Sequence, residues 1–243
     1  MLASFGLEIV ECGGTLALHV QSGDNVYAGV LLSRPESRPQ VREAAAILGI
    51  PEVEFLEFPY GEWIVDVQSK ERIVSLIRRL RPDIVITQDP HHAQHDLDPD
   101  RRLIALLYTE SFALAGRDWH VAECGGHAPH PVSNIYYMTP EHPNCIVEIS
   151  QTFELKQQAL ATLGSQLEFS AQMIERMASP QALRHMLENY DSLKENKREL
   201  GLALHRQFDK ALALSNGLAG HSGVVMGEAY RREGVFKLNK LSG

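Results

Sequence analysis

Three histidines and four aspartates fall within fourteen positions of this chain, in the stretch DPHHAQHDLDPDRR at residues 89–102. Imidazole and carboxylate groups are the ligands that a borderline divalent metal such as zinc prefers. A catalytic zinc needs three of them and one open position, where it lowers the pKa of a bound water to about 7. One hypothesis is therefore a metal-dependent hydrolytic site in this stretch, with zinc bound by His91, His92, His95 and Asp98.

A solvated loop that opens a helix is the simpler interpretation of the same residues. Aspartate is a preferred N-cap residue, and proline is favoured at the first helical position. Asp98 and Pro99 fit these two positions, with Asp96 just before them, and the histidines would then be exposed loop residues. The spacing alone leaves both interpretations open.

Two other stretches combine glycine with polar residues. ECGGTLALH (11–19) predicts a turn into a helix whose first N–H groups could hold an anion or a sugar hydroxyl, although a plain tight turn is the simpler interpretation. CGGHAPHP (124–131) places His127 and His130 three residues apart, either as a ligand pair or in a solvated loop, and the solvated loop is preferred.

The end of the chain carries charges but no recognisable catalytic motif. SGVVMGEAYRREGVF (222–236) brings Glu228 close to Arg231 and Arg232, and it predicts a terminal strand or turn docked on a sheet. The whole sequence lacks a GxSxG elbow, a P-loop, a GxGxxG turn and a CxxC pair. Serine hydrolases and nucleotide-phosphate enzymes therefore have no support.

The composition excludes further classes of function. A net charge of −8 argues against a nucleic-acid-binding protein, which normally carries a basic surface. Three cysteines without framework spacing indicate free thiols in a reducing compartment, and the first residues, MLASFGLEIVECGG, lack the basic region of a signal peptide. No apolar run is long enough to cross a bilayer. We therefore expect a cytoplasmic protein that binds neither nucleic acid nor membrane.

Alternating strands and helices must position these residues. Apolar and amphipathic runs predict strands at 25–32, 52–58 and 83–88 and helices at 37–49, 67–82 and 98–116. This alternation is typical of a Rossmann-like α/β fold with a mostly parallel, doubly wound sheet. Ligands bind beyond the carboxyl ends of the strands in such folds. Residues 89–102 follow a predicted strand and open a helix, so they lie where a site is expected.

The second half of the chain is mostly helical. Residues 133–138 and 144–150 are predicted strands, and helical patterns dominate from 152 to about 215. The part at about 165–215 is charged on most faces, so we expect a helical C-terminal extension that is solvated or makes an oligomer contact. Because no linker or repeat interrupts the chain, a single domain over 1–243 is predicted. The first strand of the fold is lost or very short, or the chain as given is incomplete.

Several phrases, in this order along the chain, resemble the LmbE-like, PIG-L-type N-deacetylases. They are CGGTLALHVQSGDNVYAGVLLSRPE, REAAAILGI, RPDIVITQDP with HDLDPDRR, NIYYM, IVEISQTFELKQQALATLGSQ and GEAYR, and together they run from about residue 3 to 231. The ordered set is specific, although no single phrase is. The resemblance implies a Rossmann-like sheet with a pocket at the strand C-termini, and often trimers or hexamers. In active members a divalent metal, usually zinc, activates water to cleave an acetamide on an amino sugar or similar substrate.

The motifs that carry this chemistry in the family are altered here. Active members have an HPDDE-like motif just before the GGT, in which the His and second Asp bind metal and the first Asp is the general base. The matching positions here are Ser4, Phe5, Gly6, Leu7 and Glu8. By the resemblance, both metal ligands and the base of this motif are replaced.

The second family motif, HPDH, is altered as well. Here it is Asp98-Pro99-Asp100-Arg101, so the third ligand position holds Arg101, a permanent cation that cannot bind a metal ion. Asp98 stands where the family has a His that polarises the substrate or stabilises the oxyanion. Leu163 replaces a His that active members tend to carry just before the late helix. Arg101 is expected to pair with Asp98, Asp100 or Glu8 and to fill the volume that the metal left.

Two functional hypotheses follow. The first is a non-catalytic family member without a cofactor, which binds a sugar-like small molecule or assembles, as a homo-oligomer (trimer or hexamer) or with an active paralogue. Its ligand pocket would draw on Glu8, Gly13, Gly14, Thr15, Asp89, His92, Asp96, Asp98, Asp100 and Arg101. The second is a divergent zinc-dependent hydrolase of an amide or related bond, with its site rebuilt from residues 91–100. Incompleteness of the chain would be a third explanation, but it accounts for neither Arg101 nor Leu163.

Overall fold

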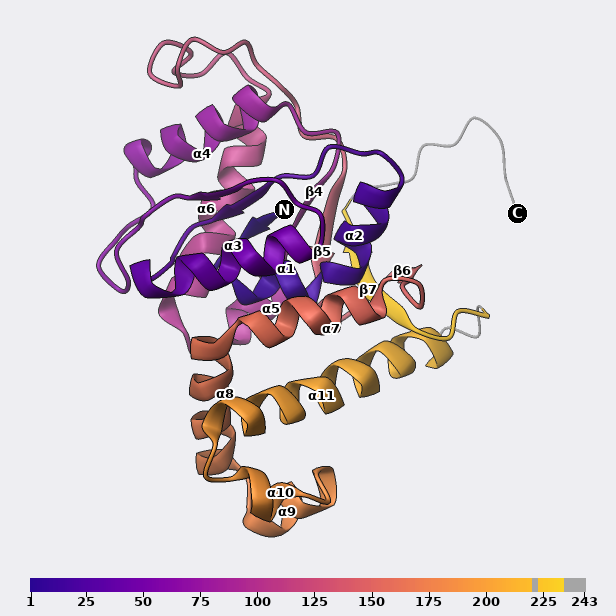
Figure 1. The fold of residues 1–243 in the computed structure, drawn as a ribbon. Helices are drawn as coiled ribbons and strands as arrows, with labels where there is room; N and C mark the ends of the chain where they lie inside the picture. Colours follow the sequence, from indigo (N-terminus) through magenta and orange to yellow (C-terminus); the bar gives the residue numbers. More distant parts are fainter. Residues whose placement is uncertain (220–222, 234–243) are drawn as a thin grey trace. The chain divides into compact units, whose positions relative to one another are not determined.

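A computed structural model of the chain describes residues 1–219 and 223–233. It divides into two compact units, each of which is discontinuous in the sequence. Among the described residues, the first unit comprises Met1–Trp63 and the part from Ile146 to Ala229, and the second comprises Ile64–Cys145 and residues 230–233. The single domain expected over 1–243 stays a prediction. The fold class is the expected mixed α/β one, with a mostly parallel sheet of seven strands in the described residues (Figure 1).

The first unit opens with three parallel strands in the order β3-β2-β1. They are β1 (Leu2–Ala3), β2 (Ala28–Val30) and β3 (Val53–Phe55). The register pairs Leu2 with Gly29 and Ala28 with Val53. The intervening elements are α1 (Leu7–Glu11), α2 (Gly13–Gln21), a 3₁₀ turn η1 (Pro35–Ser37) and α3 (Arg38–Ile47). The first strand is therefore present but only two residues long.

The second unit repeats the strand–helix pattern. Its elements are α4 (Val67–Leu80), β4 (Val85–Gln88), α5 (Pro90–His95), α6 (Pro99–Ala115), β5 (Ile135–Met138) and the end of β7 (Gly227–Arg232). Strands β4 and β5 are parallel, whereas β7 runs antiparallel to β5 and pairs Arg232 with Tyr136. Strand β6 (Cys145–Glu148) begins where the second unit passes into the first. A strand is thus present within 222–236, where a terminal strand or turn was predicted, and residues 222 and 234–236 lie outside the described part.

Helix α5 corrects one expectation, because residues 90–95 were predicted as loop. Asp89 has an extended backbone, and its carboxylate accepts a bond from the His91 N–H, which starts a turn at Pro90. Asp98 caps α6 in the same way through the Asp100 N–H, as the sequence indicated. Residues 89–102 therefore contain the N-termini of two successive helices, α5 and α6, each capped by an aspartate.

A buried arginine ends α6. The Arg78 side chain, from α4, is 1% exposed, and its guanidinium donates to the carbonyls of Ala115, Leu114, Arg117 and Trp119 at 2.6–3.3 Å. A cation at this position also complements the negative end of the helix dipole. Arg78 thus satisfies carbonyl groups that the end of α6 leaves without helical partners.

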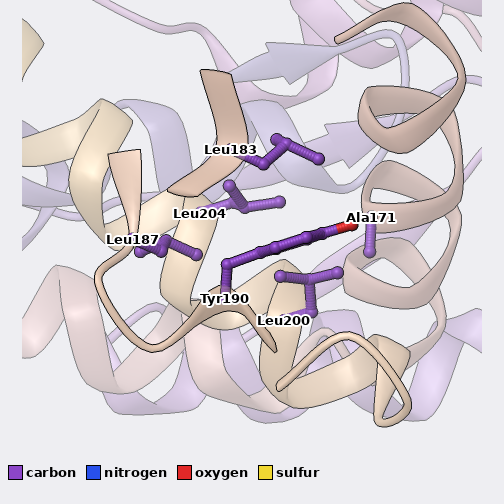
Figure 2. Packing of buried hydrophobic residues seen from close by; sticks show 6 residues of the cluster. All are labelled: Ala171, Leu183, Leu187, Tyr190, Leu200 and Leu204. Carbon is purple, nitrogen blue, oxygen red and sulfur yellow. The ribbon is translucent and has the colours of Figure 1, made fainter. Parts of the chain in front are cut away.

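The late helices belong to the first unit and build a small core of their own. They are α7 (Phe153–Thr162), α8 (Gly164–Met177), α9 (Pro180–Met186), α10 (Tyr190–Leu193) and α11 (Lys197–Ala219). The core consists of Ala171, Leu183, Leu187, Tyr190, Leu200 and Leu204. Figure 2 shows the Tyr190 ring among the leucines, and its hydroxyl donates to Glu175. The extension is therefore more ordered in its packing than its charged sequence suggested.

Helices α8 and α11 approach each other at Gly201. A Cβ atom placed there would lie 2.1 Å from the carbonyl oxygen of Leu167 on α8. Because Gly201 has no side chain, α8 and α11 can approach each other this closely. None of the described helices is both long and apolar enough to cross a membrane.

Candidate functional site

The positions matching the first motif lie directly after β1 in the first unit. Ser4 is 1% exposed, its carbonyl accepts the Leu32 N–H, and its hydroxyl has no partner among the described residues. The Glu8 carboxylate accepts the Phe5 N–H at 3.0 Å and so closes the turn into α1. Gly6 packs on α3, where a Cβ would meet Val41 at 2.3 Å. Here Glu8 supports the backbone of its own turn.

The anion bound at the glycine turn into α2 is a side-chain carboxylate of the protein itself, that of Glu228. The two oxygens of Glu228 accept the N–H groups of Gly14 and Thr15 at 3.0 and 2.8 Å. Gly14 must lack a side chain, because a Cβ would lie 2.9 Å from the nearer Glu228 oxygen. Gly13, Gly14 and Thr15, expected in a ligand pocket, are instead buried, and the N–H groups of the last two are taken by Glu228.

A lysine completes this cluster. The Lys156 ammonium, from α7, lies 3.0 Å from Glu228 and donates to the Glu11 carbonyl at 2.7 Å. Burial alone would lower the pKa of Lys156, but attraction to Glu228 and Asp209 outweighs it, and the pKa is raised. Lys156 was not among the site residues predicted from the sequence. The only signals were its place in the IVEISQTFELKQQALATLGSQ phrase and the position of Glu228 in GEAYR.

In the second unit, Asp89 is neutralised by an arginine from β7. Arg231 binds the Asp89 carboxylate through two N–H groups at 3.0 and 2.9 Å and lies 4.5 Å above the Tyr137 ring. Burial would raise the pKa of Asp89, but the bonds from Arg231 and from the His91 N–H outweigh it, and the pKa is lowered. Asp89 is therefore a fixed anion that holds β7 and α5 rather than a proton acceptor poised for a ligand.

Arg101, at the third ligand position, is held within the same unit. Its guanidinium donates to the Gln88 side-chain oxygen at 2.9 Å and lies 3.2 Å from the Asp96 carboxylate. Asp96 and Gln88 are thus partners that the sequence analysis did not name. Asp96 and Asp98 each accept the N–H group two residues further on, as expected of turn and cap residues.

The three histidines within residues 89–102 do not form a cluster. His91 and His95 are exposed, His92 is half-buried, and His95 lies 3.8 Å from Glu141. Over residues 1–219 and 223–233, no three His, Cys, Asp or Glu side chains gather in a way that could hold a metal ion. The proposed ligand set of His91, His92, His95 and Asp98 is therefore not brought together.

Two further candidates, His130 and Leu163, make local contacts within the fold. His130 donates from Nε2 to the Pro82 carbonyl at 2.9 Å and so ties two loops together. Leu163 is 2% exposed and sits at the junction of α7 and α8, where its carbonyl accepts the Leu167 N–H. An imidazole at this position would need a polar partner in an apolar setting.

The residues at the family's ligand positions do not fit a zinc ion. They offer a serine hydroxyl, a leucine and a guanidinium, whereas zinc in proteins takes imidazole, thiolate or carboxylate groups. No reaction step can be built on a metal held by these three side chains.

Comparisons with known proteins agree with the fold. A family model described as GlcNAc-PI de-N-acetylase (PIG-L) matches residues 8–100. The diacetylchitobiose deacetylase of Thermococcus kodakarensis is 30% identical over 127 residues, which are 51% of this chain and 47% of that protein. The match thus spans about half the length of this curated relative.

Solved structures extend the likeness over nearly the whole chain. The N,N'-diacetylchitobiose deacetylase of Pyrococcus horikoshii has a TM-score of 0.69 at 20% identity, and covers 96% of this chain and 82% of its own. A conserved protein of Thermus thermophilus has a TM-score of 0.71 at 21% identity, with coverages of 100% and 97%. The 4-carboxy-2-hydroxymuconate hydratase of Pseudomonas putida has a TM-score of 0.67 at 18% identity, with coverages of 99% and 98%.

At these identities the solved structures establish a shared fold. The family model adds sequence similarity over residues 8–100, which include the GGT turn and the Asp-Pro-Asp helix start. The chain is thus similar in sequence to the PIG-L de-N-acetylases over residues 8–100, and it shares its fold with a solved diacetylchitobiose deacetylase.

Proposed function

We propose that this chain is a non-catalytic member of the LmbE/PIG-L-type N-deacetylase family, which keeps the fold and uses it to bind a small molecule. The observation that carries the proposal is the set of side chains at the ligand positions. Ser4, Leu7 and Arg101 cannot together hold zinc, and without a metal there is no activated water for amide hydrolysis.

Local contacts in the second unit support the proposal. A histidine at position 101 would leave Asp96 and the Gln88 oxygen without the guanidinium that now binds them. Asp89 is likewise committed to Arg231 and to the start of α5. The altered residues have acquired partners of their own, which is what we expect of a site maintained for its structure.

The divergent-hydrolase alternative has weaker support. It needs at least three donors from residues 91–100 around one centre, and none gather among the residues that the structure describes. Ligand identity, oligomeric assembly and cytoplasmic location also stay proposals. No disulfide joins the three cysteines in the described residues, which supports a reducing compartment.

Metal analysis together with an amidase assay tests the proposal. The protein is purified without chelator, loaded with excess zinc, desalted and analysed by elemental mass spectrometry. Acetate release is then measured with N-acetylglucosamine and diacetylchitobiose. We expect far less than one zinc per chain and no acetate above a blank.

A matched variant separates a rebuilt site from adventitious metal. His92→Ala combined with His95→Ala removes two donors of the alternative site, and both side chains are at least partly exposed, so the fold should persist. Zinc-dependent acetate release that this double variant loses would refute the proposal and establish the divergent hydrolase.

A further inference from the structure

Two aromatic rings and an arginine form a stack in the first unit. The rings of Phe5 and Tyr60 lie 5.9 Å apart, with 18° between their planes. The guanidinium of Arg34 lies 5.8 Å from the centre of the Tyr60 ring. Tyr60 is 41% exposed, Arg34 is exposed and Phe5 is half-buried. We call these three residues the aromatic platform.

The platform lies at the carboxyl edge of three parallel strands. Phe5 follows β1, Arg34 follows β2 and Tyr60 follows β3. Since parallel strands end at one edge, the loops after them meet there, and ligands of open α/β sheets bind in that place. Ser4, directly before Phe5, adds a buried hydroxyl that has no partner among the described residues.

The positive charge of the platform is not neutralised by the protein. Arg38, four residues from Arg34, is paired with Glu57. Arg34 has no such ion pair with any carboxylate in the described part of the chain, and its guanidinium lies over the ring of Tyr60. An exposed guanidinium resting on an aromatic ring keeps N–H donors that can bind an acid in a bidentate way.

We propose that the aromatic platform binds a ring-shaped small molecule with an acidic substituent, such as a sugar acid or an aromatic carboxylate. The ring of the ligand packs on the aromatic side chains, and its acid group binds Arg34. The proposal deepens the function proposed above by naming the ligand class. It rests on that function in one respect, namely that the ligand is bound and released without being chemically changed.

The chemistry of the platform excludes simpler ligands. A free inorganic anion would use Arg34 but gain nothing from two stacked rings. A neutral sugar would use the rings, whose faces suit the C–H groups of a pyranose, but would leave the cation without a partner. A ligand that combines both features is the one that gains from all three residues.

Saturation-transfer NMR with matched probes tests the proposal. The full chain is titrated with glucuronate and benzoate, and with glucose and benzyl alcohol as their neutral counterparts. We expect saturable binding of the two acids, roughly tenfold tighter than that of the neutral compounds, because one charge-assisted hydrogen bond contributes about that factor. Arg34→Gln should abolish the difference, and Tyr60→Ala should weaken both members of each pair.

Control variants come from α8 in the same unit. Arg176→Gln removes an exposed arginine, and Phe169→Ala removes a phenyl ring that is 56% exposed. Both should leave binding unchanged. Equal binding of acids and neutral compounds, affinities that Tyr60→Ala leaves unchanged, or no binding of any probe would overturn the platform. None of these results affects the amidase test, and acetate release in that test would refute the absence of catalysis without touching the platform.

Discussion

The carboxylate of Glu228 offers the sharpest test of how the first unit is held together. It is 6% exposed and binds two N–H groups of α2 and the ammonium of Lys156. Glu228→Gln keeps the size of the side chain and removes its charge. The amide also has only one acceptor oxygen, so its NH₂ group must face one of three donors.

The expected loss of stability follows from the charge that remains. Breaking a buried ion pair from one side costs about 3–5 kcal/mol, because the other charge stays buried without a partner. Lys156 keeps its bond to the Glu11 carbonyl, which favours the lower end of this range. We therefore expect Glu228→Gln to lower the free energy of unfolding by about 3 kcal/mol, out of a total of roughly 5–15 kcal/mol for a typical protein.

Urea unfolding followed by far-UV circular dichroism measures this loss. Lys156→Met in the Glu228→Gln background should restore part of it, since the unpaired ammonium is then gone. The exposed pair of Arg184 and Asp191 supplies the control, and Asp191→Asn should shift the unfolding midpoint far less because water screens that pair. A loss below about 1 kcal/mol for Glu228→Gln, in the range of surface pairs, would refute the reasoning.

Three further predictions concern single positions. Gly201→Ala should destabilise the chain by about 1–3 kcal/mol in thermal unfolding, because the new Cβ overlaps the Leu167 carbonyl; an unchanged midpoint would show that the helices separate freely. Arg78→Met should cost about 3 kcal/mol in the same assay, since several buried carbonyls lose a charged donor; retention of wild-type stability would count against its role in ending α6. Burial lowers the pKa of His205 although Asp209 acts against this, so the folded state favours the neutral ring. The unfolded state therefore binds the proton first, and stability should fall as pH drops through about 6.5. His205→Gln should flatten this dependence in urea midpoints measured between about pH 7.5 and 5.5, and an equal slope in both proteins would contradict the assignment.

Local signals in the sequence predicted most of the elements. The Asp98-Pro99 pair located the start of α6, and Gly49, with φ of +82°, ends the turn after α3 as expected of a C′ glycine. The β-branched run at 83–88 became β4. Each of these signals lies within a few residues of the feature it predicts, which is why one sequence was enough.

The contacts that define the candidate site could not be predicted in this way. Glu228 meets Gly14 across 214 residues, and Arg231 meets Asp89 across 142. Charge and spacing along the chain do not say which acid meets which base once the strands are assembled. The helix α5 was missed for a different reason, because histidines and aspartates have weak helix preference and the cap at Asp89 decides the conformation.

Strand β7 has a consequence for the order in which the chain assembles. Its Glu228 caps α2 in the first unit, and its Arg231 neutralises Asp89 in the second. On the ribosome, α2 emerges long before β7, whose Glu228 accepts the N–H groups at the start of that helix. Helices α4 and α6, in contrast, are capped by the aspartates directly before them, Asp66 and Asp98. In the nascent protein, Lys156 and Asp89 therefore lack their partners until β7 is made.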